Sequence, residues 1–159
     1  MSDLETMPGH LIRRLHQISV ARFTSRMAEA GIDLTAVQYA ALLTLRDHPG
    51  LDQQTLAGMI AYDRVTIGGV IDRLVQKGFV NRETSPNDRR ARVLMLSDQG
   101  GNAVEVATPW VDKVQEDLIS QLTSEERDNF LNLLQKTTKA GNEMSRAPLR
   151  HGAKVKISQ

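Results

Sequence analysis

The sequence has no cysteine, no long apolar run and almost no net charge, which is +1 over 159 residues. Without cysteine the chain can form neither disulfides nor thiolate metal ligands. No apolar run approaches the roughly 18 residues of a membrane-spanning helix. The first ten residues, MSDLETMPGH, lack the basic and apolar segments of a secretion signal. We therefore expect a cytoplasmic protein that does not associate with membranes.

Patterns typical of catalysis and of metal binding are also missing. The histidines form no i, i+4 pair and no HExxH motif, which argues against a dedicated metal site; they are His10, His16, His48 and His151. There is no GxxxxGK[ST] phosphate loop, and no nucleophile with a nearby base can be assembled from a local pattern. We expect no enzymatic activity, no metal and no cofactor.

The length is that of one domain, and the charge along it is uneven. Residues 63–92 carry seven basic against four acidic side chains, net +3, whereas residues 98–128 carry two against eight, net −6. The low total charge argues against a sequence-independent coat on nucleic acid. The uneven distribution would direct the basic segment towards phosphate groups.

Residues 52–78 have the pattern of two short helices. Asp52 is placed to cap the first, and Asp63 the second. Each helix has apolar residues at i, i+3, i+4 spacing, namely Leu56, Met59 and Ile60 in the first and Ile67, Val70, Ile71 and Leu74 in the second. Gly78 is placed to end the second helix.

Residues 79–84 and 91–96 are rich in strand-forming types, and the SPNDRR segment between them has turn formers and paired arginines. Two helices followed by a β-ribbon predict a winged helix-turn-helix, a mainly α fold with a small β-wing. In such a unit the second helix enters the major groove of DNA and the ribbon reaches the neighbouring backbone.

The series LAGMIAYDRVTIGGVIDRLVQKGFVNRETSPNDRRARVLMLSDQG resembles the MarR family of bacterial transcriptional regulators, whose wing tip carries a DxR pattern, here Asp88 and Arg90. The resemblance extends to about residue 145 and implies a homodimer made by terminal helices. It divides this single domain into dimerisation helices at 10–30 and 98–145, a winged helix-turn-helix at 35–96 and a basic tail at 147–159. Gly69 departs from the family, because many members have a base-reading side chain there.

On this scaffold we expect DNA contacts from the start of the first short helix, the second helix and the wing: Gln53, Gln54, Thr55, Arg64, Thr66, Arg73, Asn87, Arg89, Arg90 and Arg92. Asp88 is expected to brace the wing by holding an arginine side chain, because phosphate repels a carboxylate; Arg73 is one candidate partner. The alternative is that these side chains only decorate a solvated surface.

The flanking helices have their own start signals and apolar stripes. Thr35 with Gln38, and Thr123 with Glu126, form capping boxes. The helix at 10–30 has two apolar stripes and therefore needs two covering surfaces, one of which a partner subunit could supply. The helix that Ser97 caps has an apolar seam, at Val104, Ala107, Val111, Val114 and Leu118, and contains Pro109, which predicts a kink or a local break.

The first helix, with LIRRLHQI, resembles the family branch that answers to aromatic carboxylates or their coenzyme A thioesters. This resemblance implies an effector site at Arg13, Arg14, His16, Arg22, Tyr39 and Trp110. A guanidinium can hold a carboxylate through two hydrogen bonds. The alternative is structural, with arginines that pair with acids, a hydrogen-bonded histidine, and aromatic residues in the core.

Together these features predict a homodimeric transcriptional repressor that binds a pseudo-palindromic operator in double-stranded DNA and is released by a small aromatic acid or aromatic acyl-CoA effector. The rival hypothesis is a winged helix that serves only as a protein-interaction module, because fold alone does not settle function.

Overall fold

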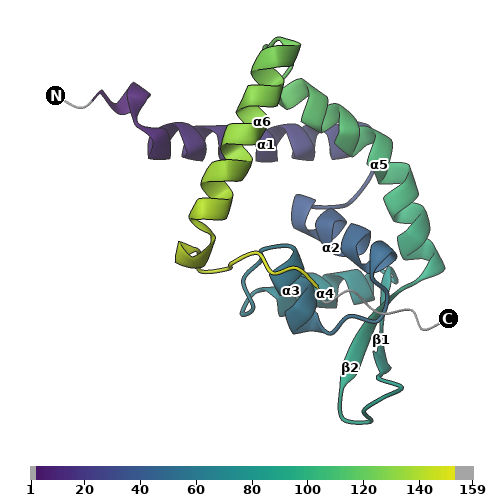
Figure 1. Cartoon of the computed structure of the whole chain (residues 1–159). Coiled ribbons are helices and arrows are strands. Elements are labelled where there is room, and N and C mark those ends of the chain that lie inside the picture. The colour runs from purple at the N-terminus through teal and green to yellow at the C-terminus, as the bar shows by residue number, and fades with distance from the viewer. Residues whose placement is uncertain (1–2, 153–159) are drawn as a thin grey trace.

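The computed structural model describes residues 3–152 as a winged unit joined to three long flanking helices (Figure 1). The elements in chain order are η1 (Leu4–Thr6), α1 (Pro8–Glu29), α2 (Ala36–Asp47), α3 (Gln53–Met59), α4 (Ile67–Gln76), β1 (Val80–Thr84), β2 (Arg92–Leu96), α5 (Asp98–Leu118), α6 (Ser124–Ala140) and η2 (Asn142–Met144). The mainly α fold with a β-wing is therefore confirmed. Within residues 3–152, no helix is long and apolar enough to cross a membrane.

Local hydrogen bonds explain most helix boundaries. The capping boxes predicted at Thr35 and Thr123 are both present, and the Asp52 carboxylate accepts the backbone N–H of Thr55 at 2.8 Å. Ser97 caps α5 by accepting the N–H of Gly100 at 3.0 Å. Gly78 follows α4 with φ of 73°, the left-handed conformation expected after a helix.

One local prediction is wrong. Asp63 does not cap α4 directly, because Thr66 is the N-cap and Asp63 instead holds the turn before it, with its carboxylate accepting the N–H of Val65 at 2.8 Å. Of the kink or local break predicted at Pro109, the break does not occur, since α5 continues through this residue. One lost backbone hydrogen bond is tolerated because the apolar seam on both sides of the proline is buried.

The wing is an antiparallel pair in which Val80 lies opposite Leu96 and Thr84 opposite Arg92. An isolated bridge between Leu51 and Leu94 adds the segment before α3 to the outer edge of β2. The wing is thus tied directly to the start of α3.

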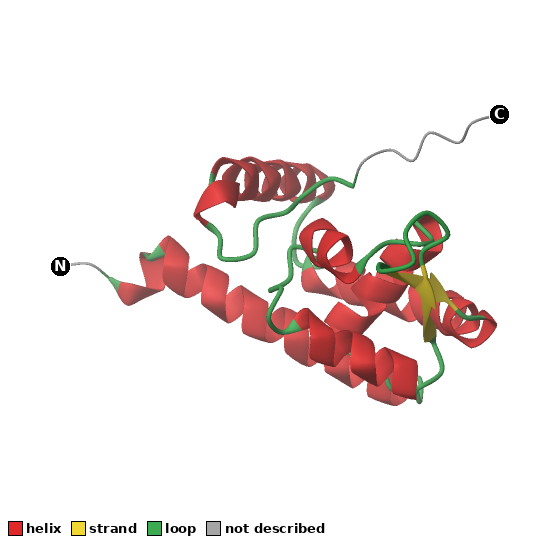
Figure 2. Ribbon diagram, turned by 90° about the horizontal axis from the view of Figure 1, so that it is seen from below, coloured by secondary structure: helices red, strands yellow, loops and turns green. Residues whose placement is uncertain are grey.

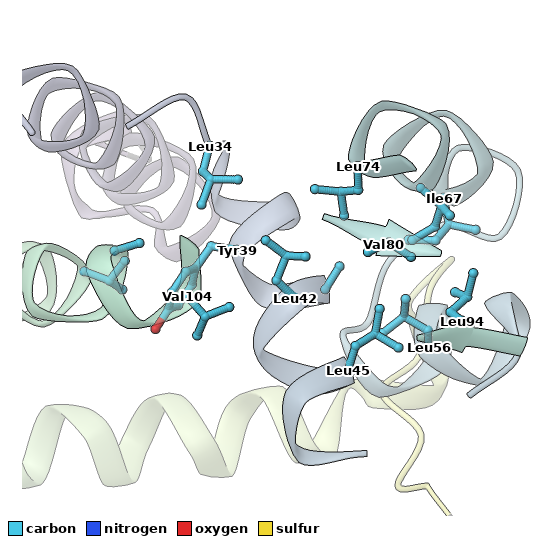
Figure 3. Close-up of a cluster of buried hydrophobic side chains, with 14 of the residues drawn as sticks. Leu34, Tyr39, Leu42, Leu45, Leu56, Ile67, Leu74, Val80, Leu94 and Val104 are labelled. Atoms are coloured by element: carbon cyan, nitrogen blue, oxygen red, sulfur yellow. The ribbon is translucent and has the colours of Figure 1, made fainter. Parts of the chain in front are cut away.

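The core lies between α2, α3, α4, the wing and α5. In Figure 3, Leu42 and Leu45 of α2 lie among side chains from α3, the wing and α5. The fully buried larger side chains are Leu42, Leu45, Leu56, Ile67, Ile71, Leu74, Val80, Val104 and Val114. Each contributes about 1.5–3 kcal/mol on burial, so this cluster fixes the orientation of α4 and of the wing.

The flanking helices bury much less of their surface. In α1, only Phe23 and Met27 are buried, near its C-terminal end, where Arg26 donates to Asp117 of α5 at 2.6 Å. The first turns of α1 extend away from the winged unit in both views (Figures 1 and 2). Every residue of α6 remains at least partly exposed. The single chain therefore leaves most of α1 and all of α6 incompletely covered.

Candidate nucleic-acid interface

The start of α3 presents one free glutamine and two side chains that are already engaged. Gln54 is exposed. The Thr55 hydroxyl donates to the Asp52 carboxylate at 2.8 Å, and Gln53 is half-buried, with its amide beside Gly68 of α4. Of the three residues predicted here, Gln54 is the one positioned to reach outward.

The turn before α4 carries Arg64, Val65 and Thr66, all exposed. Thr66 donates its hydroxyl to the carbonyl of Asp63 at 3.2 Å, which orients its methyl group and hydroxyl at the start of α4. Val65 has 89% of its surface exposed, a large fraction for an apolar side chain next to charged groups. The sequence analysis did not select it, although a valine that breaks the apolar period of the helix was a usable signal.

Beyond its first turn, α4 offers little to a base edge. An added Cβ at Gly69 would point into open space. Arg73 is exposed in the last turn of the helix. The neighbouring Asp72 forms an ion pair with Arg82 of β1, so the wing is connected to α4 by charge as well as by the core. Arg82, which no sequence motif singled out, therefore helps to hold the wing against α4.

At the wing tip the backbone is held by short polar side chains. The Asp88 carboxylate accepts the backbone N–H of Arg90 at 2.9 Å, and Asn87 donates its N–H to the Ser85 hydroxyl at 3.3 Å. Asp88 therefore braces the backbone of the turn. In the described chain this main-chain amide is the donor that Asp88 binds, in place of the side chain of Arg73 considered from the sequence.

The wing arginines Arg89, Arg90 and Arg92 are all exposed, two at the tip and one at the start of β2. Arg64 and Arg73 add two more cationic side chains. The winged unit therefore has exposed cations on two separate elements: the recognition segment, which is α4 with the turn before it, and the β-ribbon of the wing. A winged helix-turn-helix contacts duplex DNA through these same two elements.

The sequence profile of the MarR family matches residues 34–91, which contain α2, α3, α4 and the wing tip. Similarity to a regulator extends well beyond that segment: HosA of Escherichia coli O111:H- is 31% identical over 131 residues, 82% of this chain and 94% of the relative. The chain belongs to the MarR family. It is thus a member of a family of transcriptional regulators, in agreement with the expectation that it is not an enzyme.

Other relatives extend this comparison. The repressor NicR of Pseudomonas putida is 31% identical over 134 residues, 84% of each chain. The structure of PcaV from Streptomyces coelicolor with its natural ligand has a TM-score of 0.80 at 30% identity and covers 89% of this chain and 98% of PcaV. BpsR of Bordetella bronchiseptica, whose DNA binding is regulated by 6-hydroxynicotinic acid, has a TM-score of 0.81 at 29% identity, covering 87% and 97%.

A further MarR-type structure contains the partner predicted here. The repressor CouR, bound to a 23-mer DNA duplex, has a TM-score of 0.78 at 29% identity and covers 87% of this chain and 96% of CouR. The fold of this chain is therefore one that binds duplex DNA in a related protein.

The residues predicted for an effector site come from three helices. Arg13 is exposed on α1 and contacts Gln17 at 3.1 Å and His10 at 3.3 Å. Arg14, His16 and Arg22 are also exposed on α1.

The two aromatic residues of this group lie deeper. Tyr39 of α2 is 8% exposed, and its hydroxyl pairs with that of Thr108 on α5 at 3.0 Å. Trp110 of α5 is half-buried, with the Lys113 ammonium 4.9 Å from its ring centre. Within the described chain, the cavity beside α1 has a volume of about 360 Å³ and is lined by other residues, among them Val20, Phe23 and Met27. The single chain thus does not bring the six residues into one cavity.

Proposed function

We propose that this protein is a cytoplasmic, homodimeric repressor that binds a pseudo-palindromic operator and is released by an aromatic carboxylate or its coenzyme A thioester. The observation that carries the proposal is the exposed cationic surface formed by the recognition turn and the wing, held on a rigid apolar core. Catalysis and cofactors have no part in it.

The dimer is supported by the uncovered flanking helices, in line with the proposed division into dimerisation helices at 10–30 and 98–145 and a winged unit at 35–96. The large exposed apolar residues of α1 and α6 are Leu11, Ile12, Ile18, Val20, Leu131, Leu133 and Leu134. Exposed apolar patches of this kind mark interaction surfaces. A two-fold axis through them would place two winged units about one helical turn, 10–10.5 bp, apart on DNA.

In the proposed complex, Arg64, Val65 and Thr66 enter the major groove with Gln54 nearby. Val65 presents methyl groups suited to the C5-methyl of thymine, whereas Arg64 and Thr66 offer donors to base edges. Arg89 and Arg90 enter or straddle the minor groove, where each neutralises a flanking phosphate, and Arg92 and Arg73 contact phosphates or brace the wing. The other proposed DNA contacts are Gln53 and Thr55 at the start of α3 and Asn87 at the wing tip.

The effector proposal combines the arginines of α1 with what is known of the relatives. BpsR responds to 6-hydroxynicotinic acid, an aromatic acid, and PcaV binds a natural ligand. An anion near Arg13, Arg14 or Arg22, beside His16 and the ring of Trp110 or Tyr39, would lie between the dimer helices and the winged unit once a partner covers α1. A shift of the dimer helices around the bound anion would change the distance between the two winged units.

Dimerisation and DNA binding are tested together by sedimentation and by fluorescence anisotropy with duplexes from the promoter of its own gene. Leu133→Glu should yield monomers with much weaker operator binding, whereas Asn132→Glu, a matched change at the neighbouring exposed position, should not. A wild-type monomer, or a dimer that ignores these duplexes at low salt, would refute the proposal and favour a protein-interaction module.

The effector is tested by a thermal-shift screen of benzoates, cinnamates and their thioesters. Arg14→Ala should abolish release from DNA by an active compound and leave operator affinity nearly unchanged. Normal release from the Arg14→Ala variant would show that the effector site lies elsewhere.

A further inference from the structure

The chain after α6 returns to the winged unit and contacts α3. In Figure 1 this yellow segment leaves the lower end of α6 and passes across α3. The backbone N–H of Arg150 donates to the carbonyl of Gly58 at 2.7 Å. Residues 147–152 of the basic tail predicted at 147–159 thus make a contact while remaining at least partly exposed, and Lys154 and Lys156 lie outside the described residues.

Two glycines allow this contact. A Cβ at Gly58 would lie 3.1 Å from Cβ and 3.3 Å from Cγ of Arg150, and one at Gly152 would lie 2.7 Å from the sulfur of Met59. Glycine inside α3 costs about 1 kcal/mol relative to alanine. The close approach of the returning segment supplies a structural reason for Gly58.

The segment is also fastened to the end of α6. The side-chain amide of Asn142 pairs with both backbone groups of Leu149: its oxygen accepts the N–H at 2.8 Å, and its NH₂ donates to the carbonyl at 3.2 Å. The Arg150 guanidinium holds both carboxylate oxygens of Glu143, at 2.5 and 3.0 Å. This hydrogen bond with Arg150 is the main reason that the pKa of Glu143 is lowered. The segment is therefore fixed by η2 immediately before it reaches α3.

A second contact reaches the turn that leads into α4. Arg146 lies 3.1 Å from the carboxylate of Asp63. Although Arg146 is largely exposed, the Asp63 side chain is not, at 19%. Asp63 is the residue that organises this turn, through its bond to Val65 and its carbonyl bonds to Thr66 and Ile67. The returning segment thus contacts both α3 and the turn that leads into α4.

Direct packing does little to join α6 to the winged unit. A space of about 1000 Å³ is bordered by the last turns of α6, by the returning segment and by Ala61 of the α3–α4 turn. With α6 partly exposed throughout, the returning segment is the connection that spans this space.

We propose that residues 145–152 form a strap that positions the α3–α4 turn relative to α6, with Gly58, Asn142, Arg146 and Arg150 as positioning residues for operator binding. The inference rests on the proposed DNA-binding function and deepens it. When only part of a population has the binding-competent arrangement, the apparent dissociation constant rises in inverse proportion to that fraction. The strap raises the fraction of dimers in which both winged units are oriented to bind the operator.

The first test compares two truncations of the full chain. One lacks residues 145–159 and therefore the strap; the control lacks residues 153–159 and keeps it. We expect the strapless protein to bind operator about tenfold more weakly than the control, as if the competent fraction fell to about a tenth. The slope of log K against log salt should be the same in both, because no phosphate contact is lost.

A second test uses Gly58→Leu, which introduces a better helix former into α3 and places a side chain where Arg150 lies. It should weaken binding about tenfold in the control truncation and have no further effect in the strapless one, since coupled sites are non-additive. Asn142→Ala should act in the same direction, with Asn129→Ala on the exposed side of α6 as its matched control.

Hydrogen–deuterium exchange of the α3–α4 turn provides a readout that requires neither DNA nor a partner. Exchange there should rise in the strapless protein and not in the control. The strap has no positioning role if the two truncated proteins show the same hydrogen exchange and the same operator affinity. The same conclusion follows if the strapless protein binds operator more tightly than the control, or if its slope of log K against log salt is smaller. A full chain that ignores every duplex, but whose turn becomes unprotected on strap removal, would refute the proposed function and leave the strap contact established.

Discussion

The wing arginines allow the most quantitative test of DNA binding. Arg89 and Arg90 are exposed on a turn whose backbone is held by Asp88, so removing both side chains changes charge with little effect on the fold. Exposed substitutions of this kind usually change the free energy of unfolding by less than about 0.5 kcal/mol. Any larger change in DNA affinity of Arg89→Ala/Arg90→Ala therefore reports the interface.

The magnitude follows from counterion release. Each phosphate neutralised contributes about 0.9 to the slope of log K against log salt, and a dimer loses four arginines, so the slope should fall by about 3.6 if each contacts one phosphate. Over a fourfold change from about 50 to 200 mM salt, the ratio of variant to wild-type dissociation constants should shrink by about 150-fold.

The assay is fluorescence anisotropy of a labelled operator duplex over that salt range. The matched control is Lys113→Ala/Lys136→Ala, which removes the same number of positive charges from exposed positions on α5 and α6. We expect its salt slope to stay close to that of the wild type. An unchanged slope in the wing variant, or an equal decrease in both variants, would refute the assignment of phosphate contacts to the wing.

Three further outcomes follow from the structure. Val65→Ala should weaken operator binding about tenfold, near the lower end of the effect of one wrong base pair, and replacing the contacted thymine by uracil should then have no further effect. Leu42→Ala, at a fully buried position, should lower the free energy of unfolding by about 2–5 kcal/mol in chemical denaturation; a loss below 1 kcal/mol would show that the site is not part of the rigid core. The hydrogen bond from Arg26 lowers the pKa of Asp117 below its ordinary 3.8, so its contribution to stability is present above about pH 4 and is lost as the pH falls through the lowered pKa. In Asp117→Asn the melting temperature should therefore fall less as the pH is lowered than it does in the wild type. The same decrease in melting temperature at acid pH in both proteins would contradict this assignment.

The elements of the winged unit could be predicted from sequence because their signals are local. A capping box such as Thr35 with Gln38 satisfies backbone donors within one helical turn, and Gly78 ends α4 through its own backbone preference. Such signals depend on few distant residues. They therefore gave the start of α2 and the end of α4 correctly.

Features that depend on distant contacts were beyond the same approach. The bridge between Leu51 and Leu94 and the hydrogen bond from Arg150 to Gly58 each join segments that lie far apart in the chain. Asp63 has the side chain of a helix cap, but the added turn from 64 to 66 moved the cap to Thr66. The sequence also assigned Tyr39 to a pocket wall or to the core, and its bond to Thr108 of α5 required the packed structure.

The two glycines of α4 connect stability to the way in which specificity is achieved. Gly68 and Gly69 together cost about 2 kcal/mol relative to alanine, while Ile67, Ile71 and Leu74 each contribute about 1.5–3 kcal/mol by burial, so the helix is held by its core face. The outer face then offers few atoms for base recognition.

In the proposed complex, specificity therefore depends on Arg64, Val65 and Thr66 and on the distance between the two winged units. When DNA binding depends on this distance, a ligand can regulate it. An effector that binds the misspaced dimer 100-fold more tightly than the binding-competent dimer shifts the equilibrium between the two by about 2.7 kcal/mol. A base-reading side chain introduced by Gly69→Arg should then increase operator affinity and make release by the effector less complete, because part of the recognition no longer depends on spacing.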